Sequence, residues 1–201
     1  MNKFILLLLL TSFATYSQEI TQRLIYINTV EDANKFAQEN PDFYIEFVSW
    51  TPEIENEEAA QEMADSKIGE IFADDEFAYK IFEITNIPAF RASYIYLDGS
   101  KLSLKEINKL RSKILEEYAR QKDFTSLFRK YNMDGRQTDG DLGWFITGTM
   151  VPEFEDAVKT HKENDIFKVD VPSRKWYYIV LKSFDNIEIK RFTLLKINKV
   201  K

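Results

Sequence analysis

The sequence predicts an α+β fold made of two consecutive units, and two observations support this fold class. The second half of the chain passes from a strand candidate through helical segments to further strand candidates, an order typical of α+β domains. The first half contains short blocks that match blocks of the second half in the same order. With 201 residues, of which 44% are hydrophobic and 30% charged, the chain can build a hydrophobic core.

Two helices of the second half have clear start signals. Ser103 and Glu106 form a predicted capping box, and hydrophobic residues follow at helical spacing up to Tyr118. Asp123 is the expected N-cap of a shorter helix whose apolar face ends at Tyr131. Both helices are therefore predicted from signals in their own first turns and apolar faces.

A third helix and three strands complete the elements expected in this half. Pro152 and the acidic residues after it favour a helix start, because proline suits the first helical position and acids interact well with the positive end of the helix dipole. A polar loop that contains glycine, residues 132–140, precedes this helix. Segments rich in β-branched and aromatic residues predict strands at 94–97, 176–181 and 191–197.

The first half is interpreted as a shorter, degenerate copy of the second. Three blocks match in order, residues 52–56, 70–72 and 79–82 with residues 152–156, 165–167 and 177–180. A predicted strand at 24–27 and a capped helix at 29–38 correspond to the strand at 94–97 and the helix after it. We therefore expect a degenerate unit at 18–88 and a fuller unit at 89–201.

The first 17 residues have the pattern of a secretory signal peptide. Lys3 supplies the positive start, residues 4–10 are all apolar, and small residues precede a cleavage position after Ser17. A membrane anchor is the alternative, but the apolar run is much shorter than the roughly 20 residues of a spanning helix. We expect an exported chain without a membrane span after cleavage, located in the periplasm or, as an open alternative, secreted from the cell.

Charge and residue types exclude several functional classes. The net charge of −6 disfavours binding to nucleic acid, whose phosphates an acidic surface repels. The chain has no cysteine, which excludes disulfides, thiol nucleophiles and cysteine-based metal sites. Its single histidine, His161, leaves few ligands for a transition metal. An acidic helix is expected over residues 53–64, but it lacks the oxygen-rich loop spacing of a calcium site.

A long motif in the second unit carries a family resemblance. Residues 140–145 read GDLGWF and residues 148–157 read GTMVPEFEDA, flanked by RASYI at 91–95 and WYYIV at 176–180. In this order the segments resemble the signature of parvulin-type (PpiC-like) peptidyl-prolyl cis-trans isomerases. The resemblance implies a parvulin/FKBP-like four-stranded antiparallel sheet with surrounding helices. It also implies an exported protein-folding factor whose partners are unfolded or proline-containing polypeptides.

The chemistry implied by the resemblance requires no metal or cofactor. Rotation about an Xaa-Pro bond is slow because the amide has partial double-bond character, with a barrier of about 20 kcal/mol. A catalyst has to bind the twisted amide better than either planar form. An apolar pocket for the proline ring and a polar group beside the amide are the parts that such a site needs.

The resemblance assigns the proline pocket to Leu142, Met150 and Phe154. A polarizable thioether and an aromatic face suit a pyrrolidine ring, which agrees with this assignment. The alternative is that all three are ordinary core residues.

The polar residues depart from the usual pattern of the family. Asp134 matches the polar position ahead of the glycine-containing loop and would polarise the amide. Tyr94 and Tyr178 stand where the family usually has a histidine on each of two central strands. The two tyrosines can hydrogen-bond across a sheet but do not titrate near neutral pH. A non-catalytic chaperone or envelope complex subunit that binds polypeptide is therefore the alternative to an active isomerase.

Overall fold

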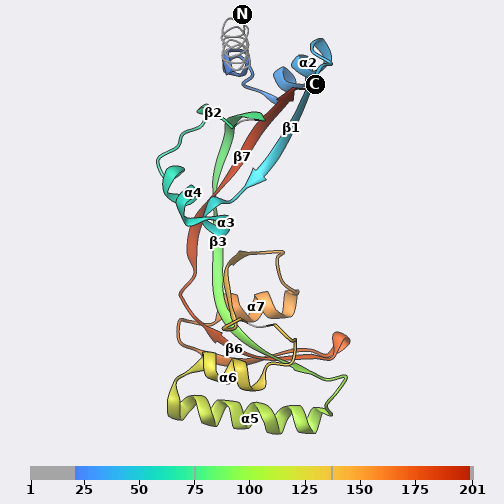
Figure 1. Cartoon of the computed structure of the whole chain (residues 1–201), viewed down its shortest axis with the longest axis vertical. Helices are drawn as coiled ribbons and strands as arrows, with labels where there is room; N and C mark the ends of the chain where they lie inside the picture. The colour runs from blue at the N-terminus through green and yellow to red at the C-terminus, as the bar shows by residue number, and fades with distance from the viewer. Residues whose placement is uncertain (1–20, 75, 137, 200–201) are drawn as a thin grey trace, which may run out of the picture. The chain divides into compact units, whose positions relative to one another are not determined.

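A computed structural model describes residues 21–74, 76–136 and 138–199 (Figure 1). The predicted signal peptide, residues 1–17, lies outside the described residues. The chain divides into two compact units: one contains the residues up to Asn86 together with those from Lys190 onward, and the other contains residues 87–189. Among the described residues, no helix is both long enough and apolar enough to cross a membrane.

The second unit contains the predicted helices and an antiparallel sheet. Its helices are α5 (Leu104–Gln121), α6 (Phe124–Tyr131) and α7 (Pro152–Thr160), with a 3-10 turn at Pro172–Arg174. Its strands are β4 (Asp141–Ile146), β5 (Ile166–Val171), β6 (Trp176–Lys182) and the second half of β3 (Phe77–Asp98). β4 pairs with β3, β3 with β6 and β6 with β5, all antiparallel.

Local sequence signals explain why these helices form where they do. Ser103 and Glu106 make the predicted capping box of α5, and the Asp123 side chain accepts a hydrogen bond from the third residue of α6. Pro152 is the first residue of α7. The apolar faces of the helices bury against the sheet in one core, which includes Ile95, Leu97, Ile107, Ile114, Leu127, Phe128, Phe145, Val158 and Ile179.

The first unit contains shorter helices and long strands. They are α2 (Val30–Glu39), β1 (Phe43–Trp50), α3 (Pro52–Glu55), α4 (Glu57–Glu62), β2 (Ile71–Ala73), the first half of β3 and most of β7 (Ile187–Lys199). α2 begins with the capping box of Thr29 and Asp32, as expected for the predicted helix at 29–38. β1 pairs with β7, and β2 pairs with the start of β3.

The predicted strand at 24–27 is wrong. Residues 21–25 are helical and a turn follows at Tyr26. Leu24 and Ile27 are both buried while Ile25 and Tyr26 between them are exposed, a spacing that a helical turn produces and a strand does not. The buried ammonium of Lys80 donates to the carbonyl oxygens of Leu24 and Ile27, at 3.0 and 2.8 Å, and so satisfies the end of this helix.

The single acidic helix expected at 53–64 is two helices, α3 and α4. Asn56 separates them, with an extended backbone at φ −161°. Its side-chain oxygen accepts hydrogen bonds from the N–H groups of Glu58 and Ala59 and caps α4. A residue with strong capping preference therefore ends one helix and starts the next.

The prediction of an α+β fold with an antiparallel sheet is confirmed, but the sheet is larger than the resemblance implied. Seven strands are hydrogen-bonded together in the described residues, where four were expected. The strand predicted at 191–197 forms as part of β7, but it pairs with β1, with Ile197 opposite Ile45. Residues from Lys190 onward therefore belong to the first unit, although the sequence assigned them to the second.

Candidate functional site

The six residues predicted to form the site line one pocket of about 850 Å³ in the second unit. They come from six different segments. Tyr94 lies on β3, Asp134 in the loop after α6, Leu142 on β4, Met150 in the turn before α7, Phe154 on α7 and Tyr178 on β6. The fold thus brings together residues that are up to 84 positions apart in the sequence.

Aromatic side chains form much of the pocket wall. Phe154 is only 4% exposed, and its ring meets the ring of Tyr178 edge to face, with centroids 5.5 Å apart. The Tyr178 ring also contacts Tyr96, at 5.5 Å, and Tyr94, at 6.3 Å. These contacts stabilise the packing of the rings, because aromatic pairs prefer edge-to-face or offset arrangements with centroids about 4.5–7 Å apart.

Asp134 is the carboxylate of the pocket, and three hydrogen bonds hold it. Its Oδ2 accepts from the Tyr94 hydroxyl at 2.5 Å, and its Oδ1 accepts from the Asn132 side-chain amide at 2.5 Å and the Arg136 N–H at 2.8 Å. Burial opposes ionisation, but the hydrogen bonds from Tyr94, Arg136 and Asn132 outweigh it, so the pKa of Asp134 lies below its ordinary value. The carboxylate is therefore charged at neutral pH.

Both tyrosines of the pocket are neutral hydroxyl groups. Burial and the hydrogen bond to Asp134 raise the pKa of Tyr94 well above its ordinary value. Burial is the main reason that the pKa of Tyr178 is raised to about 12, and the electrostatic effects of Tyr96 and Asp134 add to it. Tyr94 is therefore a hydrogen-bond donor to an ionised carboxylate.

The sequence suggested that the hydroxyls of Tyr94 and Tyr178 could hydrogen-bond across the sheet. In the structure these two hydroxyls do not bond to each other. Tyr94 lies opposite Val180 in the strand register, and Tyr178 lies opposite Tyr96. The Tyr94 hydroxyl donates to Asp134 instead, and within the described residues the Tyr178 hydroxyl has no hydrogen-bond partner. The two positions therefore differ: Tyr94 supports the carboxylate, whereas the Tyr178 hydroxyl at the pocket is unbonded among the described residues.

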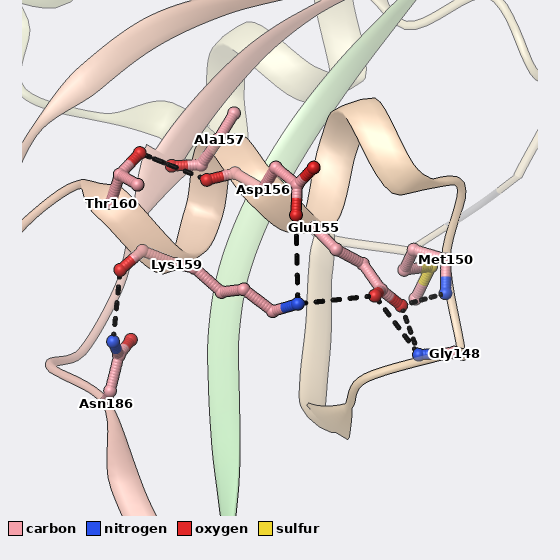
Figure 2. A network of polar contacts seen from close by, with 8 residues as sticks. All are labelled: Gly148, Met150, Glu155, Asp156, Ala157, Lys159, Thr160 and Asn186. Carbon is pink, nitrogen blue, oxygen red and sulfur yellow. Dashed lines mark hydrogen bonds and ion pairs between the residues drawn. The ribbon is translucent and has the colours of Figure 1, made fainter.

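Sequence reasoning missed the contribution of Glu155, which is shown in Figure 2. This carboxylate is 4% exposed and accepts hydrogen bonds from the backbone N–H groups of Gly148 and Met150, each at 2.8 Å. The ammonium of Lys159 lies 3.9 Å from its other oxygen. Glu155 therefore fastens the turn that carries Met150 to helix α7.

A sequence signal for this role did exist. The residue before α7 is Val151, whose side chain cannot cap a helix, so N–H groups near this helix start need another acceptor. From the sequence, the acidic residues of the first turn are expected to interact with the helix dipole, and this expectation does not include the hydrogen bonds that Glu155 accepts from the preceding turn.

Neither a cluster of metal-ligating side chains nor the single histidine of the chain lies at the pocket in the described residues. In the part of the chain that the structure describes, no group of three or more His, Cys, Asp and Glu side chains is arranged to hold a metal ion. His161 stacks on Phe167 at 3.6 Å, and its Nδ1 lies 2.7 Å from the carbonyl oxygen of Ala157, so it belongs to the end of α7 and does not line the pocket.

These features describe an α+β domain with an aromatic pocket and one tightly held carboxylate. Residues 78–183, more than half of the chain, match the family model of the PPIC-type PPIase domain. The chain belongs to this family, and the resemblance to parvulin-type isomerases drawn from residues 140–157 is confirmed.

The chain is similar to individual foldase proteins over about half of its length. The chain is 37% identical over 111 residues to the foldase protein PrsA 1 of Bacillus cereus, which covers 54% of this chain and 35% of that protein. It is 32% identical over 114 residues to the foldase protein PrsA of a Geobacillus strain, which covers 54% and 37%. The chain thus spans 35% to 37% of the length of these two relatives. A solved structure of PrsA from Bacillus anthracis aligns with a TM-score of 0.41 and 25% identity, over 51% of this chain and 44% of that one.

Proposed function

We propose that this chain is a peptidyl-prolyl cis-trans isomerase acting on Xaa-Pro bonds of exported, unfolded or partly folded proteins. The observation that carries the proposal is the pocket of the second unit, where aromatic and thioether side chains line the same cavity as a carboxylate held by three hydrogen bonds. Proline-containing polypeptides are the proposed partners. No metal or cofactor takes part in the proposed mechanism.

The proline ring binds against Phe154, Met150 and Leu142 in this proposal. Phe154 offers a rigid aromatic surface, because its ring is packed against Tyr178. Met150 is half-buried and can adapt to the pyrrolidine ring, while Glu155 holds its backbone. Binding the ring in this apolar surface removes water from the amide, which strengthens electrostatic interactions with it.

Asp134 supplies the polar effect on the amide in this proposal. The planar amide is stabilised by a resonance form that places negative charge on the carbonyl oxygen. A fixed carboxylate near that oxygen disfavours this form and so favours the twisted amide with a single C–N bond. Tyr94 holds the carboxylate in position, and the Tyr178 hydroxyl, which no other described residue engages, is available to a polar group of the substrate.

A non-catalytic, parvulin-like binding module is the second candidate. The observation that favours it is the presence of Tyr94 and Tyr178 where the family usually has histidines. Such a chaperone or complex subunit would bind proline-containing segments in the same pocket without accelerating their isomerisation.

The proposal extends to the organisation of the whole chain. The isomerase sheet corresponds to the four strands β4, β3, β6 and β5, and the unit at 18–88 is a degenerate copy without a site of its own. Residues 1–17 direct export to the periplasm. Amino-terminal sequencing of the protein recovered from a periplasmic fraction is expected to start at Gln18, and a start at Met1 contradicts the export proposal.

Exchange spectroscopy tests the function directly. Cis–trans exchange rates of short Xaa-Pro peptides are measured by NMR with the wild-type protein and with a Met150→Ala, Phe154→Ala double variant. We expect acceleration by the wild type that disappears in the double variant. Binding by the wild type without acceleration supports the binding module instead.

A further inference from the structure

Two arginines line the pocket and are unaccounted for by the proposed isomerisation. Arg136 lies in the loop after Asp134, and Arg174 lies in the 3-10 turn before β6. Both residues are exposed, and within the described residues neither guanidinium forms an ion pair or a hydrogen bond. The Arg174 guanidinium packs on the ring of Trp176, 4.7 Å from the ring centroid, which orders it beside the pocket.

These guanidiniums make the pocket more positive than the rest of the molecule. Asp134 is the single acid among the described residues that line the pocket, and three donors already engage its oxygens. Two cations therefore stand against one carboxylate, in a chain whose net charge is −6. The positive charge of Arg136 and Arg174 also acts on the pocket groups, since it lowers the pKa of Asp134 and opposes the rise in the pKa of Tyr178.

We propose that Arg136 and Arg174 form a cationic rim that binds a carboxylate side chain next to the proline, so that the protein prefers Xaa-Pro segments with Asp or Glu immediately before or after the proline. Guanidinium groups suit this role because their planar donors match the two oxygens of a carboxylate. The inference rests on the proposed binding of proline in the pocket and adds a substrate class to it.

A panel of peptides measures the preference. The peptides are blocked at both ends, which removes terminal charges, and carry Glu, Gln or Lys before the proline, or Glu after it. Binding is measured by NMR titration of the purified protein, together with cis–trans exchange. We expect at least one Glu peptide to bind about three- to tenfold more tightly than the Gln peptide, the range for one or two exposed ion pairs. The Lys peptide is expected to bind more weakly than the Gln peptide.

Variants assign the preference to the two arginines. In an Arg136→Gln, Arg174→Gln double variant, the Glu and Gln peptides are expected to bind with the same affinity as each other. Arg129→Gln removes the same charge from an exposed position on α6 outside the pocket, and it is expected to keep the preference. Raising the salt concentration to 1 M is expected to reduce the preference, because the ion pairs are exposed.

The outcomes separate this inference from the proposed function. Equal binding of the Glu, Gln and Lys peptides by the wild type overturns the cationic rim and leaves the isomerase proposal standing. A preference that survives in the double variant also overturns the rim. If no Xaa-Pro peptide binds or exchanges faster, the proposed function fails and the rim fails with it.

Discussion

The segments that begin at Pro52 and Pro152 start alike in sequence but have different structural roles. Pro152 opens the nine-residue helix α7, whereas Pro52 opens α3, which has four residues. Glu155 of α7 is buried and accepts from the backbone of the turn before its helix. Glu55 of α3 accepts from the indole of Trp50 at 3.0 Å instead. Residues 52–56 and 152–156 are therefore similar in sequence, but their matching glutamates make different contacts because the turns before the two helices differ.

The same contrast holds for two other matched positions. Phe154 is 4% exposed at the pocket, whereas Ile54 is 36% exposed. Tyr178 lines the pocket, and its hydroxyl has no hydrogen-bond partner in the described part of the chain. Lys80, in contrast, is buried, and its ammonium donates to the carbonyl oxygens of Leu24 and Ile27. Ile54 is therefore partly exposed and Lys80 satisfies backbone carbonyl groups, and neither residue lines the pocket.

The largest expected difference is between Phe154→Ala and Ile54→Ala. Truncating a buried aromatic ring leaves a cavity and costs about 3 kcal/mol of unfolding free energy, while the exposed isoleucine is expected to cost less than about 1 kcal/mol. Urea unfolding of both variants measures these costs. Equal losses would show that the exposure of the two matched residues does not reflect their packing.

Lys80→Met and Tyr178→Phe form the next pair. The first leaves buried carbonyl oxygens without a donor and is expected to cost about 2 kcal/mol, without weakening peptide binding. The second removes a hydroxyl that has no partner in the described residues, and it is expected to leave stability within about 0.5 kcal/mol of the wild type. Weaker peptide binding by the Lys80 variant, with the fold intact, would contradict this division of roles.

Glu155→Ala is expected to act on binding as well as stability. Loss of the acceptor for the Gly148 and Met150 N–H groups costs about 1 to 2 kcal/mol and loosens the turn, which raises the KM for Xaa-Pro peptides more than it lowers kcat. Glu155→Gln keeps the Oε1 acceptor and is expected to restore most of the KM. Asp156→Ala, at an exposed neighbour on the same helix, serves as the control. A KM unchanged in Glu155→Ala excludes a positioning role.

The smallest effect concerns pH. The lowered pKa of Asp134 stabilises the folded state above the ordinary aspartate pKa of about 3.9, and this stability is lost as the pH falls through the lowered pKa. The pKa of Asp134 is lowered and the pKa values of Tyr94 and Tyr178 are raised, the latter to about 12, so none of these three groups titrates between pH 6 and 9. We expect a flat kcat/KM over this range. An inflection near pH 6.5 would indicate a histidine-like group and contradict the assignment.

The sequence predicts best those structural features that are determined by residues close together in the chain, such as helix caps. The caps at Ser103 and Asp123 and the motif at 140–157 are local, and each lies where expected. The error at 24–27 arose because a short apolar run does not distinguish a strand from a helix, and Lys80, which satisfies the helix end, lies more than fifty residues away. The pairing of β7 with β1 joins residues that are distant in the sequence, and the contacts of Glu155 require the folded turn before α7. Neither feature can be read from neighbouring residues alone.

We propose that Asp134, held by Tyr94, accelerates rotation of the Xaa-Pro bond in a pocket that His161, the single histidine of the chain, does not line. The most direct measurement is NMR exchange on one Xaa-Pro peptide with the wild type and with Asp134→Asn, with binding measured in the same samples. We expect acceleration by the wild type, a loss of about 100-fold in the variant and similar peptide affinity in both. Undiminished acceleration in Asp134→Asn, with the peptide bound, would contradict it.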